Sequence, residues 1–579
     1  MFHNQLSFRN VQNPSTPLPD TSGEGIKWGF LIFLSNFSAF LVLFIFRSAD
    51  DNRLTNWEWV FSDVQIWIVF LFLISGIVIA YVVSRMTFPE HKPVLFLFIS
   101  AFAVSILFWG EPEVIVDASR YFTQAKHLEM YGINYFFREW GRGLNAWTDL
   151  PVVPFLYGLI FKFFGESRMY IQIFTSLLFS MTCVITYFIG KTLWNKDTGF
   201  YGGLLLMGIP YLLTQVPLML VDIPTMFFLT LSIYTFINVM ERGRTWIAAA
   251  SVVIFLTVFT KYSTWLMLSV LFVIFLVYLK NKKTTRKEMV RRIIVVAYIT
   301  GILITVLLIF KFTVISEQIK FLREYQMPGL RRWGESFVST FFYQTHPLIT
   351  AAALYSFFAA FRRRDLQFII IAWLLFIVVM LQIQRARYLM ITFPMLTLMA
   401  SYGFQKIKNI EMRKCLVFSI VILSLIMALT LYLPFLKKMD TVNLKDAGRF
   451  LDSIDELEIE VLTLPAENSE VNPAVAVPVL DYFTRKRISY DYEVGAFPSF
   501  ESIKESPLRF TWEYRNPGYY NASIGLSRKP VFAVISNGPA QTLPDYIEKR
   551  LAGYKKTKVF KTSLGLFRYS PVVMVYQPS

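Results

Sequence analysis

The sequence is short of the residues that build disulfide frameworks, metal clusters and cysteine nucleophiles. Its 579 residues include two cysteines and four histidines. Cys183 lies inside one apolar block and Cys415 at the edge of another, which supports neither a disulfide framework nor a cysteine-rich metal site. The sequence has no Walker loop and no dinucleotide-type glycine loop after a strand, and no GxSxG elbow or HExxH helix. A cytosolic nucleotide-sugar site is therefore unsupported.

Charged residues are also scarce. They make up 17% of the chain, against about 25% of an ordinary soluble domain, while 55% of residues are hydrophobic. The apolar residues form blocks of roughly 15–22 residues, about the length that a helix needs to cross a bilayer. We therefore predict a polytopic α-helical membrane protein, with about 13 transmembrane helices. The predicted spans are 28–46, 64–83, 94–109, 168–189, 198–217, 219–240, 246–259, 263–280, 293–311, 347–361, 366–383, 388–404 and 416–436.

The basic residues set the predicted orientation. Residues 1–27 are polar, with no apolar stretch in the first ~25 residues, so we expect no cleaved signal peptide and a cytoplasmic N-terminal tail. Alternating the spans from there makes every short inner loop net positive, as the positive-inside rule requires. The opposite orientation would place the Lys280–Arg292 cluster outside. We thus predict a multi-pass protein of the cell membrane; no basic stripe with a reading motif indicates nucleic-acid binding.

Two long segments fall on the outer side in this topology. Residues 110–167 form a large outer loop that belongs to a transmembrane domain over 28–436. Residues 437–579 mix charges of both signs and hold no block long enough to span. Helix-like stretches at 443–454, 477–488 and 545–554 alternate there with apolar, β-rich runs at 458–464, 530–536 and 572–576. The alternation predicts a small extracytoplasmic α/β domain.

The outer loop contains the first candidate catalytic group. Asp117 lies just beyond the third span, and Arg120 and Tyr121 follow at i+3 and i+4, on one face of a helix. A carboxylate at the membrane edge is suited to take a proton from an acceptor hydroxyl or amine. The alternative is an ordinary interfacial carboxylate paired with Arg120.

The end of the same loop gathers further charge and aromatic rings. Arg142 and Asp149 lie near the bilayer, where charge is costly unless it is paired or hydrated. Trp140 and Trp147 present faces that suit the apolar C–H patches of sugar rings. An aromatic belt at the membrane interface explains the two tryptophans equally well.

Charged residues recur at the outer ends of later spans. Asp222 lies between two apolar spans, where a carboxylate at mid-bilayer would cost roughly 2.5–3.5 kcal/mol. Asp117 and Asp222 share one side of the predicted topology, so they could act as acid/base partners or as ligands of one divalent cation. Lys261, Arg385 and Arg387 supply positive charge on that side, and arginine binds phosphate through two parallel hydrogen bonds. A turn position for Asp222 and snorkelling anchors for the cations are the alternatives. His346 is a weaker outer candidate.

Taken together, these segments resemble the GT-C glycosyltransferases, particularly the dolichyl-phosphate-mannose protein mannosyltransferases and the aminoarabinose transferases (ArnT-like). The matching stretches are DASRY at 117–121, the pattern A-K-x-L-x-x-x-G at 125–132, DLPVVPFLYGLIFKFFG at 149–165, VDIPTMFF at 221–228, TKYSTWL at 260–266 and RARYLMITFP at 385–394. Many members have Asp-Glu at the first motif, whereas Ala118 follows Asp117 here, with Glu111 and Glu113 as nearby substitutes. The first two spans have no assigned counterpart, and the WWDxG segment of the oligosaccharide-transferring branch is absent.

The resemblance implies an inverting transfer of a sugar from a polyprenyl-phosphate donor to a protein, lipid or glycan acceptor on the outer face. It makes Asp117 and Asp222 the expected catalytic residues. The expected substrate-binding residues are Arg120, Tyr121, Arg142, Asp149, Lys261, Arg385, Arg387 and Tyr388. No cofactor is required if the basic side chains neutralise the phosphate, although a divalent cation on Asp117 and Asp222 is an alternative. A transporter or flippase is the rival class, but transporters commonly show repeated halves, which this sequence lacks. A non-catalytic assembly subunit is a third reading.

Overall fold

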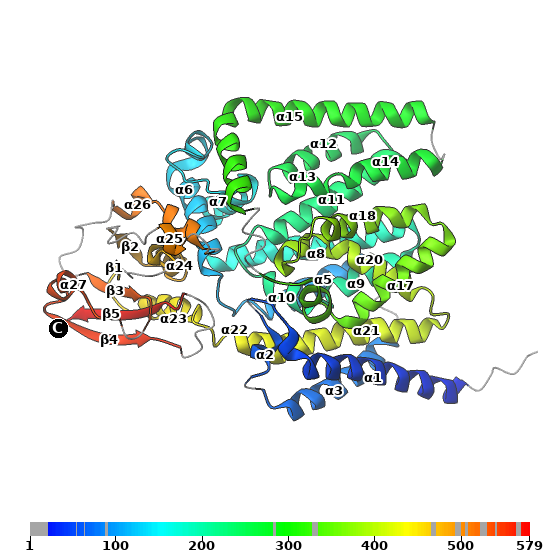
Figure 1. Ribbon diagram of the computed structural model, residues 1–579, viewed down its shortest axis with the longest axis horizontal. Coiled ribbons are helices and arrows are strands. Elements are labelled where there is room, and N and C mark those ends of the chain that lie inside the picture. The colour runs from blue at the N-terminus through cyan, green and yellow to red at the C-terminus, as the bar shows by residue number, and fades with distance from the viewer. Residues whose placement is uncertain are drawn as a thin grey trace, which may run out of the picture.

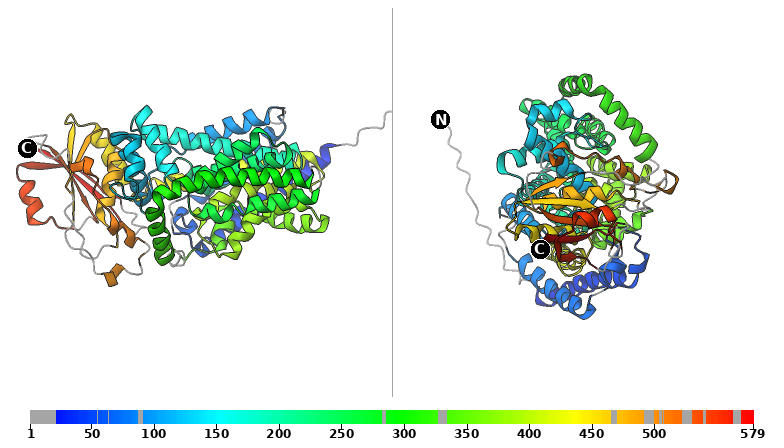
Figure 2. Two further views of the ribbon diagram at one scale, coloured as in Figure 1. Left: turned by 90° about the horizontal axis from the view of Figure 1, so that it is seen from above. Right: turned by 90° about the vertical axis from the view of Figure 1, so that its left-hand side faces the viewer.

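The protein consists of a helical bundle with a smaller α/β domain stacked on one end (Figure 1). The computed structural model describes residues 21–579 except 54, 63, 87–90, 282–284, 327–333, 465–469, 492–499, 504–505, 507, 522–529, 539–540 and 563–568. The two views of Figure 2 show that the α/β domain continues the long axis of the bundle.

Seven helices of the described residues are long and apolar enough to cross a membrane. They correspond to seven of the predicted spans. Their ranges are Trp28–Ile45 in α1 (Thr21–Ile45), Ile66–Ser84 (α3), Arg168–Leu193 (α8), Asp222–Glu241 (α11), Ser263–Lys280 across α13 (Ser263–Met267) and α14 (Val270–Asn281), Arg286–Glu324 across α15 (Arg286–Phe321) and η2 (Leu322–Gln326), and Ile410–Leu436 across α21 (Ile410–Met427), η5 (Ala428–Tyr432) and α22 (Leu433–Leu436).

The other six predicted spans form shorter or interrupted helices. These are α5 (Pro93–Ile106), α9 (Lys196–Leu206) with α10 (Pro210–Gln215), α12 (Thr245–Val258), α17 (Pro347–Arg363), α18 (Leu366–Met380), and α19 (Ala386–Leu389) with η4 (Met390–Thr392) and α20 (Phe393–Phe404). The predicted span 198–217 breaks where Pro210 begins a new helix, since proline removes a backbone donor and favours the first turn. The count of thirteen spans therefore stays a prediction.

Small residues let the bundle pack tightly. A Cβ atom added at Gly190 of α8 would lie 2.6 Å from the Cα atom of Gly199 in α9, so the two backbones touch where both residues lack a side chain. Close approach through small residues is the usual packing device of membrane helices, because apolar burial gives little driving force between helices in lipid.

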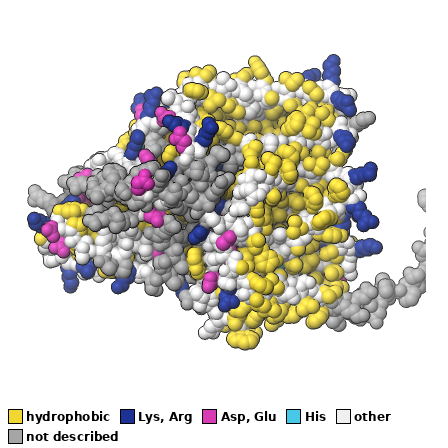
Figure 3. Space-filling model, viewed as in Figure 1, with side chains coloured by type: hydrophobic (Ala, Val, Ile, Leu, Met, Phe, Trp, Pro, Cys, Tyr) yellow, Lys and Arg dark blue, Asp and Glu magenta, His cyan; other side chains and the backbone are white. Residues whose placement is uncertain are grey.

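The outer surface of the bundle is apolar. Large side chains such as Trp67, Phe310 and Phe361 are exposed, and Figure 3 shows a broad hydrophobic belt on the face of the bundle that it draws. Lys and Arg side chains line the edge of this belt that lies farthest from the α/β domain (Figure 3). A multi-pass membrane protein has this surface, and the basic edge and the α/β domain lie at opposite ends, as the predicted topology requires.

The predicted outer loop 110–167 is largely helical. It contains α6 (Ile115–Glu139), which is interrupted at Gly132, and α7 (Val152–Phe164). The two helices lie between the bundle and the α/β domain (Figure 1). Ile115 and Ala118 of α6 pack in the core of the α/β domain, while Tyr121 and Phe122 pack in a second core with α7. This segment thus joins the two parts of the molecule.

The α/β domain is built on a mixed five-stranded sheet of order β2-β1-β3-β5-β4. The strands are β1 (Glu458–Thr463), β2 (Arg487–Tyr490), β3 (Val531–Ser536), β4 (Tyr554–Phe560) and β5 (Val572–Pro578). β1 pairs in parallel with β2 and β3, and β5 runs antiparallel to β3 and β4. The helical segments are α23 (Val442–Asp452), η6 (Pro473–Ala476), α24 (Val477–Tyr482), α25 (Phe500–Ile503), η7 (Arg509–Glu513), α26 (Gly518–Asn521) and α27 (Asp545–Arg550).

The domain differs from the sequence prediction in two strands. The helix-like stretch 477–488 ends as a helix at Tyr482, and β2 follows from Arg487. β4 is not predicted from the sequence, because YKKTKVF lacks the apolar run of a buried strand; its three lysines, Lys555, Lys556 and Lys558, are exposed. Charged side chains on an edge strand are a common protection against aggregation.

Three short elements connect the first two spans to the rest of the bundle. They are η1 (Arg47–Ala49), α2 (Trp57–Val60) and η3 (Ser339–Gln344). Asp50, between α1 and α2, accepts hydrogen bonds from the backbone N–H of Trp57 at 2.9 Å and from Ser339 Oγ at 2.6 Å. We use the term N-terminal hairpin for α1, α2 and α3 with the segments between them. The hydrogen bond from Ser339 thus connects this hairpin to the loop that precedes α17.

Candidate active site

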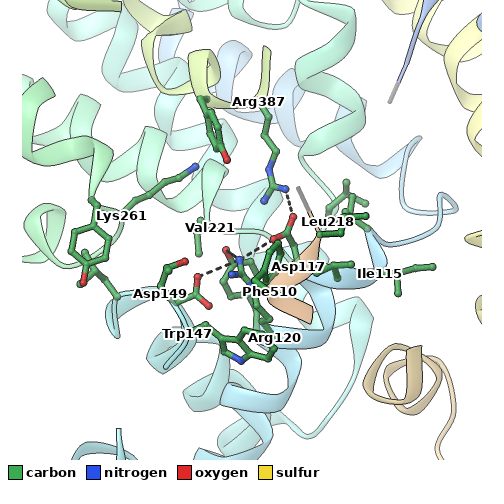
Figure 4. Close-up of a pocket in the computed structure, with 18 of the residues that line it drawn as sticks. Ile115, Asp117, Arg120, Trp147, Asp149, Leu218, Val221, Lys261, Arg387 and Phe510 are labelled. Carbon is green, nitrogen blue, oxygen red and sulfur yellow. Dashed lines mark hydrogen bonds and ion pairs between the residues drawn. The ribbon is translucent and has the colours of Figure 1, made fainter. Parts of the chain in front are cut away.

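Arg387 joins the two predicted catalytic carboxylates. Its Nε atom donates to Asp222 Oδ2 at 2.6 Å, and its Nη1 atom donates to Asp117 Oδ2. Figure 4 shows Arg387 reaching from α19 toward Asp117 on α6. Segments that are more than a hundred residues apart in sequence thus meet in one ion-pair network.

Asp222 is enclosed completely. It begins α11, its side chain is 0% exposed, and it does not line the cavity described below. Its second oxygen accepts a hydrogen bond from Lys261 Nζ at 2.6 Å. Both oxygens of Asp222 thus accept hydrogen bonds from cationic side chains, which fixes the positions of Lys261 and Arg387. That Asp222 orients the acceptor or a cation stays a prediction.

Asp117 is placed differently. It lies in the first turn of α6, its side chain is 19% exposed, and it lines the cavity. Arg120 Nη2 donates to Asp117 Oδ1 at 2.8 Å. Burial alone would raise the pKa of Asp117, but Arg387 and Arg120 outweigh it and hold that pKa well below its usual value. Asp117 is therefore ionised in the resting network.

Asp149 is another carboxylate that lines the cavity. Arg120 Nη2 lies 3.4 Å from Asp149 Oδ1, and Gln124 Nε2 donates to Oδ2 at 3.2 Å. Burial raises the pKa of Asp149 above its usual value, and Arg120 offsets this only in part. Two carboxylates that share Arg120 thus have pKa values displaced in opposite directions, a pattern that is typical of functional sites.

The cavity lies where the bundle, the α6–α7 segment and the α/β domain meet, with a volume of about 1010 Å³. Nine of the ten predicted site residues line it: Asp117, Arg120, Tyr121, Arg142, Asp149, Lys261, Arg385, Arg387 and Tyr388. Lys261 Nζ lies 4.8 Å from the centroid of the Tyr388 ring, and Arg385 Nε lies 3.8 Å from Glu335 Oε1. The cavity therefore combines positive charge with the Asp117 carboxylate.

Several lining residues were not predicted. Arg53 and Trp59 come from the N-terminal hairpin, Gln318 from α15, and Phe510 from the α/β domain. The sequence carries no motif around these residues. Each reaches the cavity only because its segment packs there in the folded protein, which residue spacing does not indicate. The segment that connects the first two spans thus contributes directly to the cavity wall.

The substitutes for the second acidic residue of the first motif have different environments. Glu113 Oε1 accepts from Arg168 Nε at 2.8 Å, and its Oε2 accepts from the backbone N–H of Met219 at 3.0 Å. Glu113 therefore connects α8 to the segment that precedes α11. Glu111 is buried, and among the described residues its Oε1 atom has no hydrogen-bond partner.

His346 has a structural position. Its Nδ1 atom accepts a hydrogen bond from the backbone N–H of Leu348 at 3.3 Å at the start of α17. Burial lowers the pKa of His346 to about 3, so the imidazole is neutral near pH 7. It does not line the cavity.

The carboxylates of the site are bound to cationic side chains. Arg387 stands between Asp117 and Asp222, so the oxygens that a shared cation would need are occupied by a guanidinium. Among the described residues, no group of three or more His, Cys, Asp or Glu side chains is placed to hold a metal ion. A divalent cation at Asp117 and Asp222 would have to displace Arg387, and this alternative stays a prediction.

Two comparisons with known proteins agree with this picture. Residues 149–310 match the family model of the dolichyl-phosphate-mannose-protein mannosyltransferases, a range that contains Asp149, Asp222 and Lys261. The fold is similar to that of ArnT from Cupriavidus metallidurans bound to undecaprenyl phosphate, with 12% identity, a TM-score of 0.52, and coverage of 84% of this chain and 98% of ArnT. The apo state of ArnT matches with 11% identity, the same TM-score and the same coverage.

A more distant likeness links the chain to the oligosaccharyltransferase of Archaeoglobus fulgidus in the apo form. The identity is 11%, the TM-score is 0.46, and the match covers 77% of this chain and 70% of the other. Comparison with curated protein sequences gives no significant match. The predicted resemblance to the GT-C glycosyltransferases is confirmed, and the chain has the ArnT fold.

Proposed function

We propose that the protein is an inverting glycosyltransferase that moves a sugar from a polyprenyl-phosphate donor to a hydroxyl or amine acceptor. The observation that carries this proposal is the network in which Arg387 binds Asp117 and Asp222 at the wall of one cavity, with Lys261 beside it. The family match and the ArnT fold support a glycosyltransferase.

The donor's phosphate binds the positive side of the cavity. Arg387, Lys261 and Arg385 line it, and Asp222 holds the first two in place. A phosphate at Arg387 competes with Asp117 for the same guanidinium, because both are anionic acceptors. As Arg387 turns toward the phosphate, Asp117 loses the charge that most lowers its pKa. Donor binding thus makes Asp117 a stronger base.

The transfer step then balances as follows. Asp117 takes the proton of the acceptor O–H or N–H, and the acceptor atom forms a bond to C1 of the sugar from the face opposite the phosphate. The C1–O bond to the phosphate breaks, and its electron pair leaves with the polyprenyl phosphate. Arg387 and Lys261 stabilise the charge that develops on this leaving group. Arg120 and Asp149 are placed to bind the hydroxyls of the reacting sugar.

We place the reaction on the extracytoplasmic side of the cell membrane, with the N-terminus and the basic loops in the cytoplasm. The support is the positive-inside rule, together with the position of the basic edge opposite the α/β domain (Figure 3). The partners are then a polyprenyl-phosphate sugar and a protein, lipid or glycan acceptor. The chain's own cations neutralise the phosphate, so the proposal includes no cofactor.

Purified protein in proteoliposomes, given a panel of labelled polyprenyl-phosphate sugars and a membrane extract as acceptor source, tests the proposal. We expect label to move covalently to an acceptor and free polyprenyl phosphate to accumulate. Movement of the intact donor across the bilayer, without cleavage of the sugar–phosphate bond, would mean a flippase. Binding with neither movement nor cleavage would mean an assembly subunit. The comparisons give no support to the transporter alternative.

A further inference from the structure

The backbone of Trp147 is held in an unfavourable conformation at the cavity. Its φ angle is 50°, in the left-handed region that bulky residues avoid. The backbone N–H of Trp147 donates to Asn145 Oδ1 at 3.0 Å, and its carbonyl accepts from Gln318 Nε2 at 3.1 Å. Conformations of this kind cost of order 1–3 kcal/mol and persist where the surroundings impose them, often at functional sites.

This conformation presents a half-buried indole to the cavity, where it meets a ring from the α/β domain. The ring centroids of Trp147 and Phe510 lie 6.1 Å apart, and the ring planes are at 88°. Both residues line the cavity. We use the term aromatic corner for Trp147 and Phe510. Figure 4 shows the corner beside Arg120 and Asp117.

The aromatic corner is joined to the charged part of the site. The guanidinium carbon of Arg120 lies 5.5 Å from the centroid of the Phe510 ring. Asn145 Nδ2 donates to the backbone carbonyl of Glu513 at 3.2 Å, which ties the outer loop to the segment that carries Phe510. Arg120 contacts Phe510 and also pairs with Asp117, so it connects the aromatic corner to the proposed base.

A sugar ring matches these surfaces. A pyranose has an apolar C–H face that lies against an aromatic ring and hydroxyl groups at its edge. Arg120 and Asp149 supply a donor and an acceptor for such hydroxyls, and Glu513 and Arg515 add charge at the cavity wall. A polyprenyl tail offers no hydrogen-bonding group and would remove water from these charged side chains without replacing it, which is costly.

We propose that the aromatic corner is a sugar-binding subsite, so that the α/β domain takes part directly in sugar recognition through Phe510. The inference rests on the proposed function in assigning a sugar to this cavity. The ring bound there belongs either to the donor or to a carbohydrate acceptor, and the experiments below separate these two sources.

The first experiment measures binding without catalysis. Full-length protein in nanodiscs, free of sugar-based detergent, is examined by saturation-transfer NMR with methyl glucopyranoside and methyl mannopyranoside. Trp147→Leu and Phe510→Leu keep an apolar side chain but lose the ring face, whereas Trp147→Phe and Phe510→Tyr keep one. We expect binding by the wild type and the aromatic variants, and affinity about tenfold weaker in the leucine variants, the size of a lost stacking contact.

Tyr546→Leu is the matched control, because Tyr546 is an exposed ring of the same domain that does not line the cavity. It should bind the glycosides as the wild type does. Equal binding by the leucine variants and the wild type, or no glycoside binding by the wild type, would overturn the subsite. Binding that depends on the aromatic corner supports the subsite even if no sugar transfer is found.

The second experiment uses the transfer assay. If the corner binds the donor sugar, the leucine variants raise KM for the donor about tenfold; if it binds a carbohydrate acceptor, KM for the acceptor rises instead. Unchanged KM for both substrates in an active enzyme would overturn the subsite and leave the transferase proposal intact. Absence of transfer from every donor tested would instead count against the proposed function.

Discussion

The two sides of the cavity are built in different ways. On the charged side, Asp222, Lys261 and Arg387 come from helix ends of the bundle and bind one another in a buried network. On the aromatic side, Trp147 and Phe510 are half-buried and come from the outer loop and the α/β domain. In the proposed function, the charge that acts in the reaction lies on the bundle, whereas recognition of the sugar lies on a loop and the α/β domain, and loops commonly vary more than the elements they connect. Substitutions on the charged side should therefore affect rate, stability or binding of the donor's phosphate, and those on the aromatic side should affect affinity for the sugar ring.

The largest expected effect comes from Asp117→Asn. Loss of the base should lower kcat about 1,000-fold, within the usual range for a general base. Membrane expression should change little. Thermal stability should fall less than in Asp222→Asn, because Asp117 is partly exposed at the cavity. The labelled-donor assay and thermal unfolding in detergent measure these two quantities. Activity close to that of the wild type would remove Asp117 from the mechanism.

Asp222→Asn should act on stability first. It leaves Lys261 and Arg387 without their buried counter-ion, and breaking a buried pair of this kind costs about 3–5 kcal/mol. The melting temperature should fall far more than in Asp117→Asn. Because Asp222 positions two phosphate-binding cations, the folded fraction should also show a raised KM for the donor, with partial recovery in Asp222→Glu. A melting temperature equal to that of the wild type would contradict the buried network.

The pH dependence of kcat/KM tests whether Arg120 controls the ionisation of the proposed base. Burial raises the pKa of Asp117, while Arg387 and Arg120 lower it. Arg120→Gln removes one lowering contribution, so the pKa of Asp117 rises and its ionised form is lost at a higher pH. The acidic limb of the kcat/KM profile should therefore move to higher pH than in the wild type. A limb that stays in place would show that Arg120 does not control the base.

The smallest expected effect concerns an ion pair outside the site. Arg85 and Glu411 lie 3.1 Å apart with both side chains exposed to about half their full extent, at 46% and 59%. Glu411→Gln should change the free energy of unfolding by no more than about 0.5 kcal/mol, as is usual for exposed pairs. Unfolding in detergent serves as the measurement, and a loss comparable to that of Asp222→Asn would mean that burial does not set the strength of the site network.

The charged side could be predicted from the sequence, and the aromatic side only in part. Asp117, Asp222 and Arg387 interrupt apolar blocks, where charge is costly, and the topology places them on one side of the membrane. Trp140 and Trp147 look alike in sequence, but Trp140 is buried against Phe136, and Trp147 lines the cavity.

Other features depend on packing that no local pattern reveals. Phe510 reaches the site only because its domain docks on α6, about 390 residues earlier in the chain. Asp222 is enclosed by the side chains of Lys261 and Arg387, which come from other segments of the chain. The number of spans does not follow from the lengths of the apolar blocks, because buried membrane helices can be short or broken when neighbouring helices satisfy their backbone groups.

The exchange of Arg387 between Asp117 and a lipid-borne phosphate is tested most directly by binding of undecaprenyl phosphate. Isothermal titration in nanodiscs would compare the wild type, Arg387→Gln and Asp117→Asn. We predict that Arg387→Gln weakens binding at least about tenfold, the equivalent of one lost charge-assisted hydrogen bond. Asp117→Asn should bind the lipid at least as tightly as the wild type, because the competing carboxylate is gone. Equal weakening in both variants would contradict the exchange and the account built on it.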